Sequence, residues 1–221
     1  MSKSEEAWHA AAPTVTRWWW IRHAPVFGGG SRLYGQEDLD CDVSETPRYE
    51  ALAAHLPEDA VWIVTNLVRT HQTAGAIWLA ADSEAAPAPM IESELAEQFF
   101  GDWQGLTWSQ MEERDAKAYA QFWQDPSGNA PPGGESFATV IERTSEAVDR
   151  LTEQFAGRDI VCVAHGGSIR GAVSQALSLH HERGLSLTID NLSLTRLDHI
   201  EGGTLNGAGQ SWRVVGVNMA I

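Results

Sequence analysis

Residues 17–22 read Arg-Trp-Trp-Trp-Ile-Arg, and residues 159–164 read Asp-Ile-Val-Cys-Val-Ala. A third run of the same kind, Ala-Val-Trp-Ile-Val-Thr, covers residues 60–65. Each run is continuously apolar at its centre and too short for a core helix, which is typical of strands buried on both faces. Such strands are the mark of a parallel sheet whose two faces are both covered.

Helical spacing of apolar residues occupies most of the chain between and after these strands. The segments expected to be helical are about residues 46–55, 69–81, 107–123, 135–155 and 168–179. A short strand is expected near 90–91, and two closing strands at roughly 191–198 and 211–217 flank a Gly-rich turn at 202–209. Residues 26–47 and 125–134 are predicted loops, and residues 85–89 break the helical pattern. Alternating strands and helices predict an α/β domain with helices on both faces of a mostly parallel sheet.

One domain accounts for nearly the whole chain. Residues 1–16 are polar and are expected to form an N-terminal extension, and residues 17–221 contain no internal repeat and no linker of domain-separating length. A chain of 221 residues is long enough to bury one substantial core.

Charge and composition limit the classes of partner. The formal net charge is -15, from 15 Lys and Arg against 30 Asp and Glu, which disfavours nucleic acid or an anionic membrane as the main partner. A few converging arginines can still bind a small phosphate. Residues 1–16 lack the apolar core of a secretory signal, no run approaches the ~20 apolar residues of a membrane span, and Cys41 and Cys162 do not suggest a disulfide framework. These features predict a cytoplasmic protein with both thiols reduced.

Candidate functional residues follow three of the predicted strands. Arg22 and His23 end the first, Arg69 comes shortly after the second, and His165 ends the third. Because ligands of such sheets bind beyond the carboxyl ends of the strands, these four side chains are expected to converge there. Glu97 follows the short strand near 90–91 and is expected to join them.

These residue types suit phosphoryl transfer through histidine. A neutral His23 can attack phosphorus and carry the phosphoryl group, while Arg22 and Arg69 offer planar forks to its oxygens. A protonated His165 would add a further charged donor. Glu97 is expected to protonate the leaving oxygen and then to activate water. This arrangement calls for neither a metal nor another cofactor.

Five sequence pieces, in order, carry a family resemblance. Together they resemble the histidine phosphatase superfamily, the phosphoglycerate-mutase-like group, over about residues 17–175. The pieces are Ile21-Arg22-His23, the run from Thr65 to Ala74, the run from Leu95 to Gly105, the run from Pro132 to Ser136, and Val163-Ala-His165-Gly166-Gly167-Ser-Ile169-Arg170. The resemblance implies a three-layer α/β/α sandwich and phosphorylation of His23. It also implies a phosphate pocket from Arg22, Arg69, His165 and Gly166, with Glu97 as proton donor.

The sequence departs from the family pattern just after His23. Ala24 stands where Gly is usual, and Val26 and Gly29 stand where the family commonly has Ser or Thr and Asn. Two polar phosphate contacts are therefore expected to be missing. Ser31, Arg32 and Tyr34 lie in the same loop and are candidates to replace them.

Other conspicuous residues have simpler interpretations. Trp18, Trp20 and Trp62 are expected in the core, whereas Trp103 and Trp108 are candidates to contact a substrate ring. Glu135 and Ser136 could equally belong to a helix start, and Arg170 is expected at the surface or in an ion pair. The pair His180-His181, on an expected loop, lacks the third spaced ligand that a metal site needs.

The sequence therefore predicts metal-independent hydrolysis of a small phosphate monoester through phosphohistidine. Three alternatives remain open: an α-ribazole-5'-phosphate phosphatase of cobalamin synthesis, a phosphoglycerate-type mutase, and a phosphate-ligand binder without catalysis. The departures at Ala24, Val26 and Gly29 motivate the last of these. The sequence names neither the substrate nor the oligomeric state.

Overall fold

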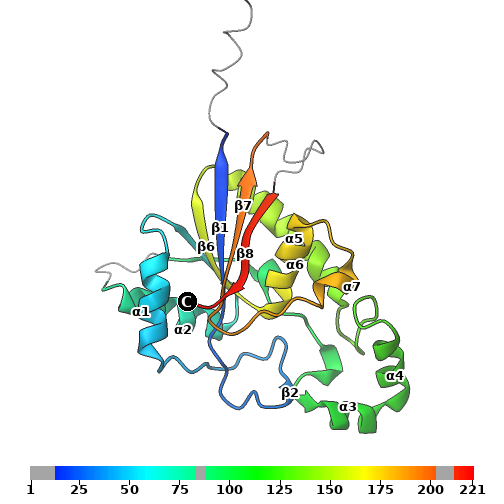
Figure 1. Ribbon diagram of the computed structural model, residues 1–221. Helices are drawn as coiled ribbons and strands as arrows, with labels where there is room; N and C mark the ends of the chain where they lie inside the picture. Colours follow the sequence, from blue (N-terminus) through cyan, green and yellow to red (C-terminus); the bar gives the residue numbers. More distant parts are fainter. Residues whose placement is uncertain (1–12, 83–87, 203–211) are drawn as a thin grey trace, which may run out of the picture.

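A six-stranded sheet forms the centre of the computed structural model, which describes residues 13–82, 88–202 and 212–221 (Figure 1). The strand order is β4-β3-β6-β1-β7-β8. The strands are β1 (Val15–Arg22), β3 (Val61–Val64), β4 (Met90–Ile91), β6 (Asp159–Ala164), β7 (Leu194–Ile200) and β8 (Trp212–Met219). The first four of these run parallel to one another, and β7 and β8 are added antiparallel at one edge. The expected mostly parallel sheet is confirmed.

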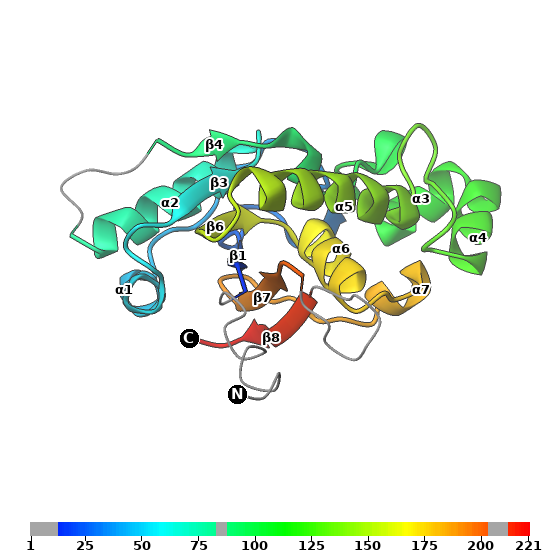
Figure 2. The same cartoon turned by 90° about the horizontal axis from the view of Figure 1, so that it is seen from above.

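Helices cover both faces of the sheet and make the predicted three layers. Figure 2 shows α1 (Thr46–His55) and α2 (Val68–Ala80) on one face, with α5 (Phe137–Gln154) and α6 (Gly166–Ala176) on the other. The helix starts follow from local chemistry. Pro47 occupies the first turn of α1, where no backbone N–H is needed, and the Ser136 hydroxyl accepts from the N–H of Thr139 at the start of α5.

The side chains of the tryptophan run in β1 point alternately into two apolar cores, one on each face of the sheet. Trp18 and Trp20 are stacked with ring centroids 4.8 Å apart, and both belong to the apolar cluster between the sheet, α5 and α6. Ile21 belongs to the cluster on the α1 and α2 side, and Trp19 packs against that cluster. Successive strand residues point to opposite faces, so one continuous apolar run serves two cores. The expectation that Trp18, Trp20 and Trp62 are core residues is confirmed.

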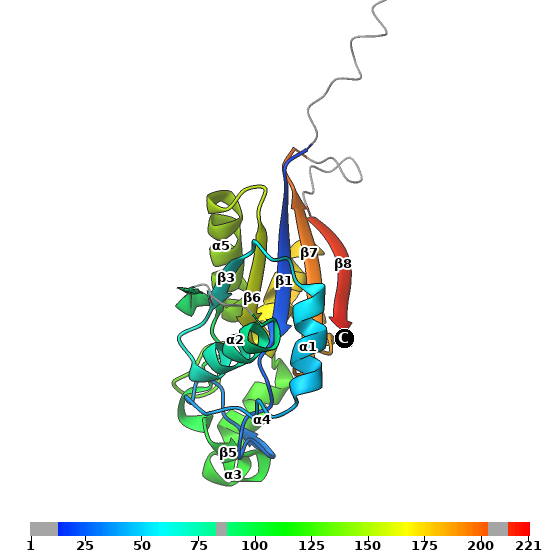
Figure 3. The ribbon, with the colours of Figure 1, turned by 90° about the vertical axis from the view of Figure 1, so that its left-hand side faces the viewer.

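A small cap lies beyond the carboxyl ends of β1, β3 and β6 (Figure 3). It contains a two-stranded sheet, β2 (Arg32–Leu33) with β5 (Leu106–Thr107), and the helices α3 (Trp108–Arg114) and α4 (Ala116–Gln124). The prediction of one helix over 107–123 is wrong, because Asp115 leaves helical geometry. Its carboxylate instead accepts from the N–H of Ala118 and begins α4.

Several other boundaries differ from those expected. β1 begins at Val15, so residues 15 and 16, assigned to the polar extension, belong to the sheet, and Thr16 is buried. α6 covers Gly166–Ala176 rather than 168–179, and His181 begins the short helix α7 (His181–Gly184) instead of lying in a loop. The predicted loop at 26–47 contains β2. Residues 1–12 of the extension and most of the expected break at 85–89 and turn at 202–209 lie outside the described residues.

Two further expectations concern the cysteines and the membrane. Cys41 and Cys162 are both free, in line with the expected reduced thiols, and both are buried. Among the described residues, no helix combines the length and apolar character needed to cross a bilayer.

Candidate active site

The backbone places the candidate histidines side by side. His23 directly follows β1 and His165 directly follows β6, and these strands are parallel neighbours in which Arg22 is paired with Ala164. The N–H of His23 donates to the carbonyl of Ala164 at 3.0 Å, and the two imidazole centroids lie 5.1 Å apart. Two strand ends 142 positions apart in the chain therefore bring the two rings together.

His23 is held in one tautomer. Its Nδ1 lies 2.6 Å from the carbonyl oxygen of Ala24, which only an N–H can satisfy, so the lone pair is on Nε2. Nε2 is buried and has no hydrogen-bond partner among the described residues. Burial, followed by the positive charges of Arg69 and Arg22, lowers the pKa of His23 to about 3. The ring is therefore neutral at physiological pH, which is the nucleophilic form.

His165 is also buried and neutral. Its Nε2 lies 2.9 Å from the Thr65 hydroxyl, and its Nδ1 is buried without a partner among the described residues. Burial lowers the pKa of His165 well below its usual value, and the nearby charges of Arg69 and Arg22 act in the same direction. The expected protonated His165 is thus not the form that this environment favours, because burial and two neighbouring arginines oppose a further positive charge.

Arg69 and Arg22 complete a set of four cationic or imidazole side chains. Arg69, in the first turn of α2, is fully buried, and its terminal nitrogens donate to the carbonyls of Gly35 and Glu37 at 2.6 and 2.7 Å. Arg22 donates to the carbonyl of Ile189 at 2.6 Å. The Nε atoms of both arginines are buried and have no partner among the described residues.

Glu97 is placed by its contacts with the start of α6. Its Oε1 accepts from the N–H groups of Gly167 and Gln98 at 2.9 and 3.0 Å. A Cβ at position 167 would lie 2.2 Å from this oxygen, so only glycine permits the contact. Both hydrogen bonds go to Oε1, and Oε2 has no hydrogen bond described among the residues that the structure covers.

Arg143 and Glu135 form a second set of contacts with the segment around Glu97. Arg143 of α5 forms a two-pronged ion pair with Glu135, and it also donates to the carbonyls of Glu94 and Glu97. Glu135 in turn accepts from the N–H of Phe99 at 2.8 Å. The sequence left the role of Glu135 undecided; in the structure Glu135 connects Arg143 of α5 to the chain around Glu97. Ser136 is the N-cap of α5.

A cavity of about 510 Å³ opens next to these residues, between the strand ends and the cap. Arg22, Glu97 and Gly167 line it, whereas His23 and His165 do not and are fully buried. Tyr34 stands at the boundary: it lines the cavity and its ring lies 6.5 Å from that of His23, edge to face.

Some lining residues differ from those that the sequence suggested. Arg170, expected at the surface or in an ion pair, lines the cavity, and its Nη1 would lie 3.4 Å from a Cβ at Gly166. Trp108 lines the cavity as expected, but Trp103 is a buried core residue of the cap. Trp123 also lines the cavity, although the sequence did not suggest it as a candidate to contact a substrate. Its position on the cavity side of α4 depends on the break at Asp115, which the sequence pattern did not reveal.

The loop after His23 has its own structure despite the unusual residues. Ala24 is buried, and its N–H donates to the Thr73 hydroxyl. Val26 forms an isolated bridge with Cys41, and a Cβ at Gly29 would lie 2.6 Å from the Val26 side chain. Of the three proposed replacements for the missing polar contacts, Arg32 and Tyr34 line the cavity and Ser31 does not.

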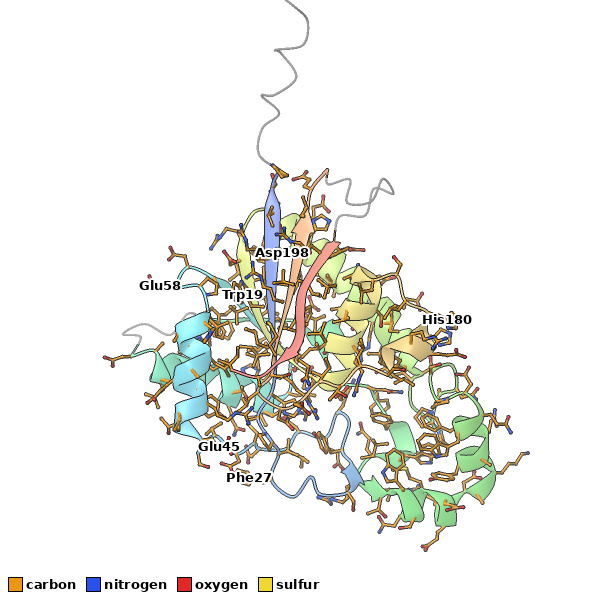
Figure 4. All side chains as sticks on the ribbon, in the orientation of Figure 1. Trp19, Phe27, Glu45, Glu58, His180 and Asp198 are labelled. Carbon is orange, nitrogen blue, oxygen red and sulfur yellow. The ribbon has the colours of Figure 1, made fainter. Side chains whose placement is uncertain are left out.

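Within the described residues, no three His, Cys, Asp or Glu side chains gather as ligands for a metal ion. His180 directly precedes α7 and its side chain is 65% exposed, and Figure 4 shows it far from Trp19 and Asp198 on the sheet.

Comparisons with known proteins identify the family of this chain. A sequence model of the histidine phosphatase superfamily (branch 1) matches residues 18–207. The glucosyl-3-phosphoglycerate phosphatase of Mycolicibacterium vanbaalenii is 33% identical over 171 residues, which cover 72% of this chain and 73% of that protein. The native structure of a mycobacterial glucosyl-3-phosphoglycerate phosphatase superposes with a TM-score of 0.75 at 25% identity, covering 92% of this chain and 99% of that one.

A putative α-ribazole-5'-P phosphatase from Escherichia coli has the same fold, with a TM-score of 0.77, 22% identity, and coverage of 93% of this chain and 97% of that chain. The family match covers the strands that carry His23 and His165 as well as the Arg69 and Glu97 segments. This chain belongs to the histidine phosphatase superfamily (branch 1).

Proposed function

We propose that this protein hydrolyses a small phosphate monoester through a phosphohistidine at His23. One observation carries the proposal. Four buried nitrogens, His23 Nε2, His165 Nδ1, Arg22 Nε and Arg69 Nε, have no hydrogen-bond partner among the described residues. Unpartnered buried polar atoms are costly, and a cluster of them around a neutral imidazole suits an oxygen-rich anion.

The first half of the reaction forms a bond between His23 and phosphorus. The Nε2 lone pair attacks phosphorus in line with the leaving oxygen, while Arg22 and Arg69 stabilise the charge on the equatorial oxygens. The P–O bond to the leaving group breaks, and the Glu97 carboxyl transfers its proton to that oxygen. A bound phosphate dianion would also favour the imidazolium form of His165, because its charge opposes the effect of the arginines.

The second half returns the enzyme to its starting state. The Glu97 carboxylate takes a proton from water as the water oxygen attacks phosphorus, the N–P bond breaks, and inorganic phosphate leaves. Arg22, Arg69 and the imidazolium form of His165 supply the positive charge that a metal provides in other phosphatases, so the reaction proceeds without one.

The test is phosphate release from a panel of monoesters in the presence of EDTA, with wild type beside His23→Ala. We expect turnover by wild type and none by the variant, together with acid-labile phosphate on the wild-type protein after rapid quenching. Turnover by His23→Ala near the wild-type level would contradict the phosphohistidine, and loss of wild-type activity in EDTA would contradict metal independence.

The panel also separates the alternative functions. It includes glucosyl-3-phosphoglycerate, because the relative at 33% identity is named for it, and α-ribazole phosphate, whose phosphatases share the fold. Exchange of 2- and 3-phosphoglycerate would indicate a mutase. Binding of phosphate esters by calorimetry without any hydrolysis would indicate a binder.

A further inference from the structure

The cavity has an aromatic wall that the phosphate group does not use. Trp108 of α3 and Trp123 of α4 both line it, and they are 43% and 47% exposed. Their ring centroids lie 5.5 Å apart with an angle of 52° between the planes, and Phe122 packs against Trp123 at 5.4 Å. Two half-exposed indoles tilted against each other form an aromatic wall, and the face of either indole can pack against a ring of a ligand.

The same cavity also has two cations in addition to Arg22. Arg170 of α6 donates through Nε to the carbonyl of Leu187, and Arg32 of β2 donates to the carbonyl of Gly28. Neither arginine forms an ion pair with a described carboxylate, whereas six other arginines do. Glu97 is the one acidic residue in the lining. In a chain with a net charge of -15, unpaired arginines gathered on one cavity favour an anion.

We propose that the leaving group of the substrate carries both a flat ring and a second anionic group. The ring packs against Trp108 and Trp123, and the anionic group, for which a carboxylate is the simplest chemistry, pairs with Arg170 and secondarily with Arg32. This inference rests on the proposed phosphatase function, because it assigns the part of the substrate that the phosphate site does not hold.

Binding of phosphonates tests the inference without any turnover. The ligands are benzylphosphonate, 4-(phosphonomethyl)benzoate and 4-(phosphonomethyl)benzamide, titrated into the wild-type protein by calorimetry. The amide has the shape of the carboxylate without its charge. A charge-assisted pair predicts that the carboxylate binds roughly tenfold or more tightly than the amide. Equal affinities of the two ligands would overturn the second anion site.

Arginine variants locate the anionic group. Arg170→Met should reduce the carboxylate-to-amide affinity ratio to near 1, and Arg32→Met should reduce it less, because Arg32 is exposed to screening solvent. Arg114→Met is the matched control, since Arg114 also donates to a backbone carbonyl in the cap but does not line the cavity. A ratio unchanged in both Arg170→Met and Arg32→Met would contradict the assignment. The carboxylate-to-amide affinity ratio compares two ligands on the same protein sample, so it does not change if part of a variant is unfolded.

Tryptophan variants test the ring. Benzylphosphonate should bind Trp108→Ala and Trp123→Ala about two- to tenfold more weakly than wild type, while methylphosphonate, which has no ring, should show no such loss. If both ligands lose affinity equally, or if neither does, the aromatic wall is not the ring site.

Hydrolysis then separates this inference from the proposed function. Phenyl phosphate is compared with 4-carboxyphenyl phosphate, and glucose 1-phosphate with glucuronic acid 1-phosphate, so that aromatic and sugar rings are distinguished. Turnover of all four esters without preference for the carboxylated member would retain the phosphatase and overturn the inference. A carboxylate-dependent affinity without turnover of any ester would retain the second anion site and overturn the phosphatase.

Discussion

At the scale of single residues, His23 links the chemistry of the site to the stability of the fold. Its side chain is held neutral by burial and by two arginines, and its pKa is about 3 against an ordinary value of 6.5. Between these two pH values the unfolded chain binds a proton that the folded chain does not. The free energy of unfolding therefore falls as the pH falls from about 6.5 towards 3.

We predict that His23→Asn makes this acid dependence of stability shallower. Asparagine can still donate to the Ala24 carbonyl but does not titrate, so the unfolded state no longer gains that proton. Urea unfolding at pH 7.0 and pH 5.0 measures the difference, with exposed His55→Asn as the control. An equal loss of stability in wild type and His23→Asn over this pH range would contradict the low pKa of His23.

Gly167 sets the position of the proposed proton donor. We predict that Gly167→Ala lowers kcat on the order of 10²-fold, because the new methyl group would occupy the place of Glu97 Oε1 and displace the carboxyl. Steady-state kinetics measure the loss. Gly75→Ala is the control, since a Cβ there meets nothing within 4 Å and alanine favours the α2 helix. A Gly167→Ala enzyme with wild-type kcat would show that the carboxyl position is not critical.

At the scale of elements, α5 acts as a support for the segment that carries Glu97. Arg143 pairs with Glu135 and also donates to the carbonyl of Glu97, whereas Arg150 pairs with Glu92. The two ion pairs have similar chemistry, but the described hydrogen bonds connect Arg143, and not Arg150, to Glu97 itself. Comparing them separates a positioning role from a purely stabilising one.

We predict that Arg143→Met slows esters with poor leaving groups more than 4-nitrophenyl phosphate. A misplaced Glu97 matters most when the leaving oxygen needs a proton, and a nitrophenolate needs one least. The measurement is kcat for an alkyl phosphate and for 4-nitrophenyl phosphate, with a loss of roughly tenfold expected in their ratio, as for one charge-assisted hydrogen bond. Arg150→Met should lower stability without changing the ratio. Equal losses on both esters in Arg143→Met would limit Arg143 to a structural role.

At the scale of the whole molecule, charge is distributed unevenly. The chain carries a net charge of -15, yet three arginines line the one cavity described beside His23, so acidic residues dominate elsewhere. Some charge is neutralised locally, as at the buried Asp198, which pairs with Arg196 and Arg213 where β7 meets β8. The remaining negative charge repels itself and opposes the compact state.

We therefore predict that added salt stabilises the protein at neutral pH. Raising NaCl from 10 to 200 mM should increase Tm by roughly 2–4 °C, which corresponds to about 1 kcal/mol for a chain of this size. Thermal unfolding followed by circular dichroism measures the shift. The same experiment near the isoelectric point is the control, because there the repulsion is small. A shift of the same size at both pH values would indicate that self-repulsion is not its cause.

The pattern of apolar and polar residues was enough to predict the α/β architecture and which side chains meet at the ends of the strands. Short, continuously apolar runs are unusual enough to mark buried parallel strands, and polar residues directly after such strands lie at one edge by the geometry of the sheet. This is why the α/β class and the proximity of His23 and His165 followed from the chain alone. Their roles in catalysis remain predictions.

The protonation states of His23 and His165 and the shape of the cavity depend on the folded arrangement of the chain. The neutral state of His165 results from burial beside Arg22 and Arg69, which depends on distances that no pattern encodes. The places of Trp123 and Arg170 on the cavity wall depend on how the cap helices break and pack, and there polar and apolar residues alternate without a clear period. Local periodicity reports which face of an element is buried, whereas the contacts between distant elements are set when the whole chain packs.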